Sequence, residues 1–337
     1  MTNQGSVCVV GSINADRFVG LARLPQPGET VLGSSLGLYA GGKGLNQAVA
    51  AARCGAETRM CGAVGADVEG AFLREAMREI GLNTDYVSSV DDATGAAYVF
   101  SLSDAENSIV VAQGANAAVS ADDATAAVRG VDVVLTQLEI APRVAALALA
   151  AGKELGAVTI LNAAPAHPSA WDMLSDVDIL VVNEGEALAL GGVGALGEHV
   201  TIIETRGAAG VTVHPRGEQP FEVAAFPIVP VDTTGAGDAF CGALAAAIAR
   251  GADLATAVRE GAAAGAIVAQ HRGAQVEALS AEAVDQLVGE ASFSAARSSS
   301  ASVSAPAVSA SAVSAPAGSR SSVPASAGSP ILGSSAK

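Results

Sequence analysis

The sequence is poor in aromatic residues, and it lacks long hydrophobic runs and closely spaced cysteines. Only 3% of its 337 residues are aromatic and only 1 is Trp, so an aromatic platform for bases or sugars is not expected. No uncharged apolar run approaches the roughly 18 residues of a membrane span. The 4 cysteines include no C-x-x-C pair, which argues against a disulfide framework or a zinc site and favours a reducing, cytoplasmic environment.

Basic residues are also scarce. There are 18 of them against 34 acidic residues, which gives a formal net charge of -16. This balance argues against a broad surface for a phosphate backbone, and we expect neither a nucleic acid nor a membrane as partner. Half of the residues are hydrophobic, so the chain can bury a large core.

The last part of the chain has a different composition from the rest. Among residues 298–337 there are 15 Ser, 10 Ala and 4 Pro, and the only charged residues are Arg320 and Lys337. Such a segment buries too little apolar surface to offset its ordering entropy. We therefore expect a folded domain over residues 1–297 and a disordered tail over 298–337 whose function the sequence does not indicate.

Strand and helix patterns alternate before the tail. This alternation predicts an α/β fold with a mainly parallel central sheet flanked by helices. The candidate strands are Val7–Val10, Val131–Leu135, Val158–Leu161, Ile179–Val182 and Val200–Ile203. The candidate helices are Leu45–Arg53, Gly70–Ile80, Pro142–Leu155, Glu184–Leu190, Ala236–Arg250, Leu254–Ala269 and Ala281–Val288.

Two segments interrupt this rhythm. Residues 17–40 contain short strand patterns separated by turn residues, and residues 95–112 contain a hairpin pattern that turns at Asp104–Asn107. Neither is followed by a helix at the spacing of a βαβ unit. The pattern predicts a small β-sheet beside the main sheet, either as a lid on a ligand site or as a structural extension.

The strongest local motif is Asp232–Phe240, in which a loop of small residues runs directly into an apolar helix. Gly235 and Gly237 would let the backbone approach a ligand closely, and the free N–H groups at the helix start would attract an anion. Asp238 lies in the first helical turn. An acid there is either a partner of the helix dipole or, beside a bound phosphate, the acceptor of a proton from an attacking hydroxyl.

A second motif is Gly41–Ala48, in which glycines precede a helix. It formally fits the start of a P-loop, but Gly44 stands where the magnesium-binding Ser or Thr should be, so we reject that interpretation. The glycine turn would instead bring Lys43 and Asn46 to a polar ligand, or simply begin a helix.

Polar residues also follow several predicted strands. Asn14 and Asp16 follow the first strand, Glu139 follows Val131–Leu135, and Asn183–Glu186 follows Ile179–Val182. Ligands of open α/β sheets bind beyond the carboxyl ends of the strands. These positions together favour a ligand site more than any one of them alone.

Seven segments lie in an order that resembles one known family. They are Gly11–Asp16, Pro27–Thr30, Gly41–Ala48, Gln113–Ala117, Asn162–Ala166, Asn183–Glu186 and Asp232–Asp238. The chain resembles the PfkB carbohydrate kinases, and within them most closely the branch that phosphorylates ribose. The resemblance covers about residues 6–290 and excludes the tail.

The resemblance implies a role for each matching residue. Asp238 would be the general base on the primary hydroxyl of the sugar, and the anion hole would be formed by the amides of Gly235, Ala236, Gly237 and Asp238. The sugar pocket would be lined by Asn14, Asp16, Gly42, Lys43, Asn46, Glu139 and Asp238. The magnesium–phosphate end would be served by Asn183 and Glu186, and the nucleotide would be held by Thr205, Gly207, Gly210 and Gly237.

The resemblance also implies cofactors and a partner. ATP and Mg²⁺ would be required, K⁺ would be a candidate activator, and the lid would pair two subunits into a homodimer. The monovalent-cation loop aligns with Asp232, Thr234, Val268, His271 and Gly273. Its last member is usually Ser but falls here at Glu277, which leaves activation by K⁺ open. Where an Asn often lies near the adenine, the alignment offers Gly261.

Two alternatives to a ribose kinase stay open at this point. A sister kinase of the same family would act on deoxyribose, fructose or a nucleoside, because one changed lid residue can alter the choice of substrate. A catalytically inactive sugar-binding module should have lost the base, whereas Asp238 and its glycines are present.

Overall fold

The computed structural model describes residues 4–102 and 107–302 of the chain. Within them a nine-stranded sheet has the order β13-β12-β11-β10-β9-β8-β1-β4-β5, parallel from β11 to β5 and antiparallel at β12 and β13. Its strands are β1 (Ser6–Val10), β4 (Glu57–Gly65), β5 (Asn83–Val90), β8 (Val133–Thr136), β9 (Val158–Asn162), β10 (Ile179–Asn183), β11 (Thr201–Thr205), β12 (Val211–His214) and β13 (Phe221–Val223).

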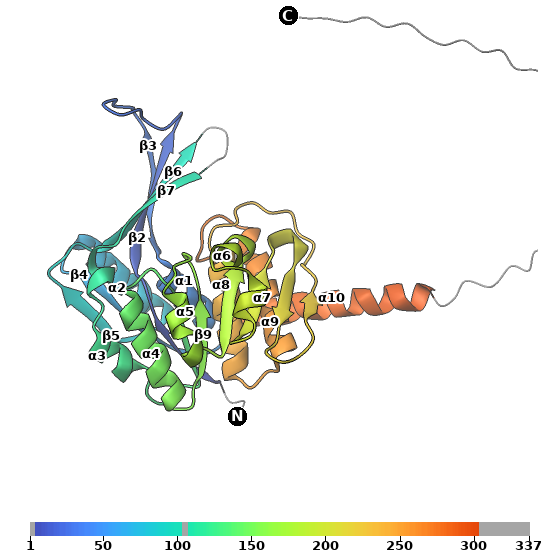
Figure 1. Ribbon diagram of the computed structural model, residues 1–337. Helices are drawn as coiled ribbons and strands as arrows, with labels where there is room; N and C mark the ends of the chain where they lie inside the picture. Colours follow the sequence, from blue (N-terminus) through green and yellow to red (C-terminus); the bar gives the residue numbers. More distant parts are fainter. Residues whose placement is uncertain (1–3, 103–106, 303–337) are drawn as a thin grey trace, which may run out of the picture. The chain divides into compact units, whose positions relative to one another are not determined.

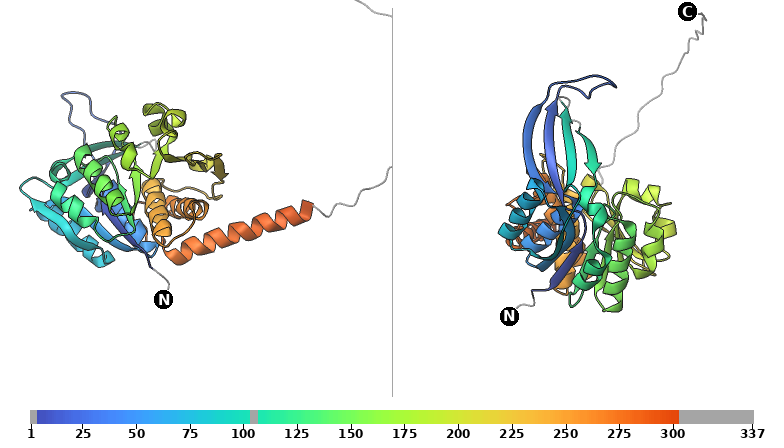
Figure 2. Two further views of the ribbon diagram at one scale, coloured as in Figure 1. Left: turned by 60° about the horizontal axis from the view of Figure 1, so that its bottom comes forward. Right: turned by 90° about the vertical axis from the view of Figure 1, so that its left-hand side faces the viewer.

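Helices cover both faces of this sheet (Figure 1 and Figure 2). The first face packs against α1 (Lys43–Arg53), α2 (Val68–Ile80), α8 (Ala236–Ala249), α9 (Leu254–Ala269) and the start of α10 (Ala281–Ser302). The second face packs against α3 (Ala121–Ala127), α4 (Pro142–Glu154), α5 (Ala170–Met173), α6 (Glu184–Ala189) and α7 (Val193–Leu196). Short 3₁₀ turns lie at Gly114–Ala118, Leu174–Asp176 and Gly207–Ala209.

Strand β1 shows why two cores form. Its side chains alternate between the faces, so that Val7 and Val9 join one buried cluster while Cys8 and Val10 join the other. Strands buried on both faces are expected to be almost continuously apolar, as the central strands of this sheet are. The predicted fold class is therefore confirmed.

A separate four-stranded sheet has the order β3-β2-β6-β7 and stands away from the main sheet (Figure 1 and Figure 2). It contains β2 (Asn14–Leu21), β3 (Ser34–Gly41), β6 (Gly95–Leu102) and β7 (Asn107–Ala112). Strands β2 and β6 pair in parallel, and each forms an antiparallel pair with its outer neighbour. We call this sheet the lid. Residues 104–106 of the expected turn lie outside the described residues.

The two expected parts of the chain meet within a helix. The internal contacts of the chain define one compact unit over Met1–Ser294 and a second over Ala295–Lys337. Helix α10 continues to Ser302, past residue 298, where the tail was expected to begin. Most of that tail, residues 303–337, lies outside the described part of the chain, so its disorder stays a prediction.

Candidate active site

Asp238 lies in the first turn of α8 and is only 7% exposed. Both of its carboxylate oxygens accept hydrogen bonds from consecutive residues of α1. Asn46 Nδ2 donates to Oδ2 at 3.1 Å, and Gln47 Nε2 donates to Oδ1 at 3.0 Å. A carboxylate held at both oxygens has a fixed orientation.

The amide of Gln47 is itself held by two other buried amides. Its Nε2 also donates to Asn162 Oδ1 at 3.0 Å, and its Oε1 accepts from Gln137 Nε2 at 2.7 Å. Asn162 Nδ2 donates to the carbonyl of Val181, which can only accept, so the direction of every bond in the chain follows. Gln47 and Asn162 lie within motifs of the sequence. The sequence indicated no role for either residue, because their hydrogen-bond partners are distant in the chain.

The start of α8 offers free N–H groups. Within the described part of the chain, those of Gly235, Gly237 and Asp238 donate to no acceptor, whereas Ala236 N donates to Thr233 O at 3.2 Å. The predicted anion hole therefore contains three available donors, and Ala236 is already engaged. Gly237 faces open space, which leaves room for an anion beside these groups.

Glycine is required at the cap of α8. Gly235 has φ 76°, a left-handed conformation that favours glycine. A Cβ there would lie 2.3 Å from the Cβ of Ala274, so the loop after α9 packs directly on this turn.

The sugar-side residues converge near Asp238. Glu139 Oε2 accepts from Ser12 Oγ at 2.6 Å and from Lys43 N at 3.2 Å, which joins the end of β1 to the start of α1. Asn14 Oδ1 accepts from Asn116 Nδ2 at 2.7 Å at the root of the lid. Gly42 has φ 89°, and a Cβ there would meet the backbone of Asn14 at 2.8 Å, so this glycine serves the close packing of the turn.

Asp16 has an unusual environment for a carboxyl group. Its Oδ1 is buried without a hydrogen-bond partner among the described residues. Burial, together with the nearby carboxylates of Glu139 and Asp238, raises the pKa of Asp16 to about 7. An unpaired buried oxygen of this kind calls for a donor, and a sugar hydroxyl is a suitable one.

Lys43 supplies the positive charge of the site. The attraction of Asp238 is the main cause that raises the pKa of Lys43, burial opposes it, and Glu139 and Glu186 add to the attraction. A lysine held charged in this way can neutralise a phosphate that enters between these acids.

The expected nucleotide residues lie at the ends of β10 and β11. Asn183 and Glu186 form a capping box on α6: Glu186 N donates to Asn183 Oδ1 at 2.8 Å, and Asn183 N donates to Glu186 Oε2 at 2.9 Å. Burial raises the pKa of Glu186 despite this bond. Thr205 ends β11, Gly207 faces open space, and Gly210 packs against the backbone of Val223 and the segment that follows β13.

The aligned cation residues join two loops. Asp232 Oδ1 accepts from Thr234 N at 2.9 Å, and its Oδ2 accepts from Gly273 N at 3.0 Å. Burial alone would raise the pKa of Asp232, but these hydrogen bonds outweigh it and hold the pKa below its usual value. The ring nitrogen Nδ1 of His271 is hydrogen-bonded to Ile267 O at 2.9 Å.

Two aligned positions differ from the family pattern. Glu277 is exposed and lies near Arg53, whose pKa it raises against the larger effect of burial. Gly261 is buried, and a Cβ there would come within 3.0 Å of Phe240. Gly261 therefore serves the packing of α9 on α8.

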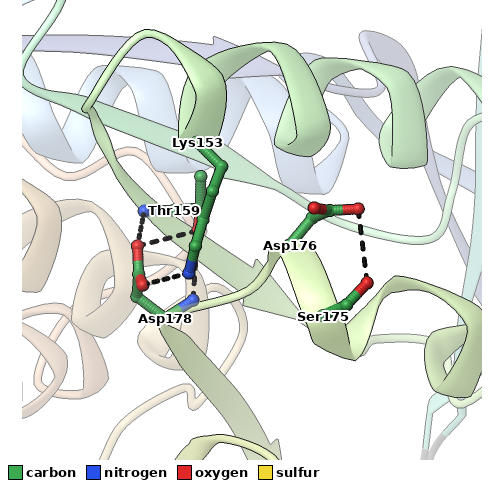
Figure 3. A network of polar contacts seen from close by, with 5 residues as sticks. All are labelled: Lys153, Thr159, Ser175, Asp176 and Asp178. Atoms are coloured by element: carbon green, nitrogen blue, oxygen red, sulfur yellow. Dashed lines mark hydrogen bonds and ion pairs between the residues drawn. The ribbon is translucent and has the colours of Figure 1, made fainter.

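A hollow of about 920 Å³ lies at the opposite, amino-terminal ends of β9, β10 and β11. Beside it Asp178 accepts from Lys153 Nζ at 2.5 Å and from Thr159 N at 2.9 Å (Figure 3). Because its polar groups bond one another and no residue expected at the active site lines it, we do not assign it to the chemistry.

The fold and this site together define the class of the protein. A mainly parallel sheet with an acid beside an anion-binding helix start is suited to phosphoryl transfer. The model of the pfkB family carbohydrate kinases matches residues 4–281, and the chain belongs to this family. The prediction of an ATP-dependent sugar kinase is confirmed at the level of this class.

Several relatives of the chain within this family are ribokinases. The ribokinase of Haemophilus influenzae is 35% identical over 288 residues, which cover 80% of this chain and 94% of that protein. The ribokinase of Bacillus subtilis is 37% identical over 268 residues, 75% of this chain and 89% of that protein. The structure of Arabidopsis thaliana ribokinase complexed with ribose and ATP has a TM-score of 0.77 and 33% identity, and covers 84% of this chain and 98% of that one.

No helix in residues 4–102 and 107–302 is long and apolar enough to cross a membrane.

Proposed function

We propose that this protein transfers the γ-phosphoryl group of ATP to the 5-hydroxyl of ribose. The observation that carries the proposal is the Asp238 carboxylate, which two amides hold at both oxygens beside three free N–H groups. The ribokinases to which the chain is similar, one of them solved with ribose and ATP, support ribose as the acceptor.

Each group of residues has a separate role in the proposed reaction. The ribose 5-hydroxyl attacks the γ-phosphorus, its proton passes to Asp238, and the bond to the β-phosphate oxygen breaks to leave ADP. The N–H groups of Gly235, Gly237 and Asp238 stabilise the charge on the transferring group. Lys43 neutralises further phosphate charge. The unpaired oxygen of Asp16 accepts hydrogen bonds from sugar hydroxyls.

Mg²⁺, which neutralises the charge of the ATP phosphates when bound, fits beside Glu186. That carboxyl is half-buried near Lys43 and Asp238, where a cation would offset the negative charge. Asn183 orients Glu186 through the capping box.

K⁺ would be held by hard oxygen donors from the loop before α8 and from the segment at and after the end of α9. They are the Asp232 carboxylate and the carbonyls of Thr234, Val268, His271 and Gly273. Asp232 already ties the two loops together, as such a site requires.

The remaining proposals concern assembly and location. The lid exposes large apolar side chains, and we propose that a second copy of the chain covers them to form a homodimer. All four cysteines are free and buried, which is compatible with the reducing cytoplasm.

The acceptor is tested with the purified protein and a panel of ribose, deoxyribose, fructose and nucleosides, each with ATP and Mg²⁺. ADP release should be fastest by kcat/KM with ribose. If a nucleoside gives turnover and pentoses give none, ribose is the wrong acceptor although the family stands.

The base is tested with Asp238→Asn. General-base catalysis contributes about 10²- to 10⁴-fold, so kcat should fall by about that factor. An acid in a first helical turn contributes only about 0.3–1 kcal/mol through the dipole, so Tm should change little. Turnover above about a third of wild type would remove Asp238 as the base.

A further inference from the structure

The loop of residues 273–275 contacts three separate parts of the site. Its first residue donates N–H to Asp232 Oδ2 at 3.0 Å, and its second packs against Gly235 at the cap of α8. Its third residue, Gln275, donates Nε2 to Asn46 Oδ1 at 2.9 Å. Gln275 lies between Gly273 and Glu277 of the aligned cation loop, but neither motif nor alignment gave a role to Gln275 itself, and it is only partly buried.

The bond from Gln275 supports the orientation of the Asn46 amide that the Asp238 carboxylate, which can only accept, requires. An amide has an accepting oxygen and a donating nitrogen on opposite sides. Because Asn46 Oδ1 accepts from Gln275, its Nδ2 is turned toward Asp238 Oδ2, 3.1 Å away. If the amide turned over, its oxygen would face the carboxylate and the two acceptors would repel.

The other oxygen of Asp238 repeats the same arrangement. Gln137 donates to Gln47 Oε1 at 2.7 Å, and Gln47 Nε2 then donates to Asp238 Oδ1 at 3.0 Å. Each oxygen is thus reached through an inner amide from α1 and an outer glutamine from another part of the chain. Of the two outer residues, Gln275 is the less buried and can be replaced with less effect on the core.

We propose that Gln275 is a positioning residue for phosphoryl transfer, which acts on Asp238 through Asn46. It holds Asn46 with its donor toward the carboxylate and so keeps that carboxylate aimed at the sugar hydroxyl. The proposal rests on the proposed function of Asp238 as the base.

The test compares Gln275→Leu with Gln275→Glu under saturating ribose and ATP with Mg²⁺. Leu neither donates nor accepts, so kcat should fall about 3- to 10-fold. Glu keeps the size of Gln but only accepts, so it should draw the Asn46 nitrogen toward itself and turn its oxygen to Asp238. We expect the Glu variant to lose about 10- to 100-fold in kcat, with the acid limb of its pH–kcat profile moved to higher pH.

Two control variants separate this from general effects of the substitutions. Gln270→Leu makes the same change at an exposed glutamine whose side chain bonds only the carbonyl of Ala266 in its own helix. Ala278→Glu adds the same charge at an exposed position nearby on the loop. Both should keep kcat within about twofold and leave the pH profile unchanged.

The results of this test distinguish a positioning role of Gln275 from a purely structural one. A purely structural Gln275 predicts that Glu, the closer match in size, is more active than Leu, and that kcat follows Tm in both variants. That result, or kcat within about twofold of wild type in both, would overturn the proposal while Asp238→Asn stays inactive. If Asp238→Asn retains turnover, the proposed base itself is wrong, which is a separate result.

Discussion

Asp16 and Gly41 face each other at the root of the lid so closely that no side chain fits between them. A Cβ on Gly41 would lie 2.0 Å from Asp16 Oδ2. Gly41→Ala should therefore displace the carboxyl group, at little cost in stability because a short side chain can rotate away. Losing the hydrogen bonds proposed between Asp16 and ribose should raise the KM for ribose about 10- to 100-fold.

Steady-state kinetics with varied ribose, and Tm, check this prediction. Gly289→Ala is the matched control, because a Cβ there meets nothing within 4 Å and the residue lies in α10. Its KM should equal that of wild type. An unchanged KM in Gly41→Ala would show that the position of Asp16 does not determine sugar binding.

The raised pKa of Asp16 also predicts how stability depends on pH. Burial, with Glu139 and Asp238, raises the pKa of Asp16 to about 7 and so keeps it protonated in the folded chain up to about pH 7, whereas its ordinary pKa is 3.8. Between these values the folded state binds more protons than the unfolded state, so its stability falls as pH rises through this window. The loss is at most about 4 kcal/mol.

Asp16→Asn removes this titration. Its Tm should fall less than that of wild type between about pH 5 and pH 8, so that the variant is the more stable of the two at pH 8. Equal pH dependence of the two Tm values would mean that Asp16 ionises normally in the folded protein.

The sequence predicted strands β1, β8, β9, β10 and β11 of the main sheet but missed β4, β5, β12 and β13. Val7–Val10 and Ile179–Val182 are apolar throughout because they are buried on both faces. Strand β5, at the edge, has a polar sequence and half-exposed residues, so its pattern did not indicate a strand. Its place follows from pairing with β4, which only the tertiary structure shows.

The candidate site, like the sheet, was only partly predictable from the sequence. Asp238, Lys43 and Glu139 carry charges beside glycine turns or strand ends, which the sequence displays. Two amides behind Asp238 gave no such signal: Gln47, which bonds Asp238, and Gln275, which bonds Asn46, are common polar residues whose roles arise from partners far away in the chain. Directional hydrogen bonds of this kind become visible only when the donor and acceptor are both placed.

Asp178 provides a test that the two ends of the sheet are independent. Its carboxylate accepts from Lys153 and from the backbone N–H and hydroxyl of Thr159 (Figure 3). Asp178→Ala leaves these donors unpaired and should lower stability by about 1–2 kcal/mol, measured by urea unfolding. Because the group lies at the amino-terminal ends of β9 and β10, kcat and KM should stay within about twofold of wild type. A large loss of kcat in a variant that remains folded would connect this end to catalysis.

The last prediction concerns the lid. Along β7 successive side chains alternate between the two faces of the lid, yet Ile109 and Val110 are 58% and 56% exposed. Strand register places Ile109 opposite Val99 and Val110 opposite Tyr98, on opposite faces. Ile109 shares its face with Asp16, the side of the sugar, and Val110 lies on the other face with Tyr98 and Leu38, which are each 38% exposed.

The face of Val110 cannot cover the site of its own chain, so it is the face that we expect a second copy to bury. Val110→Lys places a charge in that contact and should give the mass of a monomer in light scattering, whereas Ile109→Lys should remain a dimer. Deleting residues 303–337 should change neither the oligomeric state measured by light scattering nor kcat. A monomeric wild-type protein at working concentration would contradict the dimer, and a dimer that only Ile109→Lys dissociates would assign the contact to the opposite face of the lid.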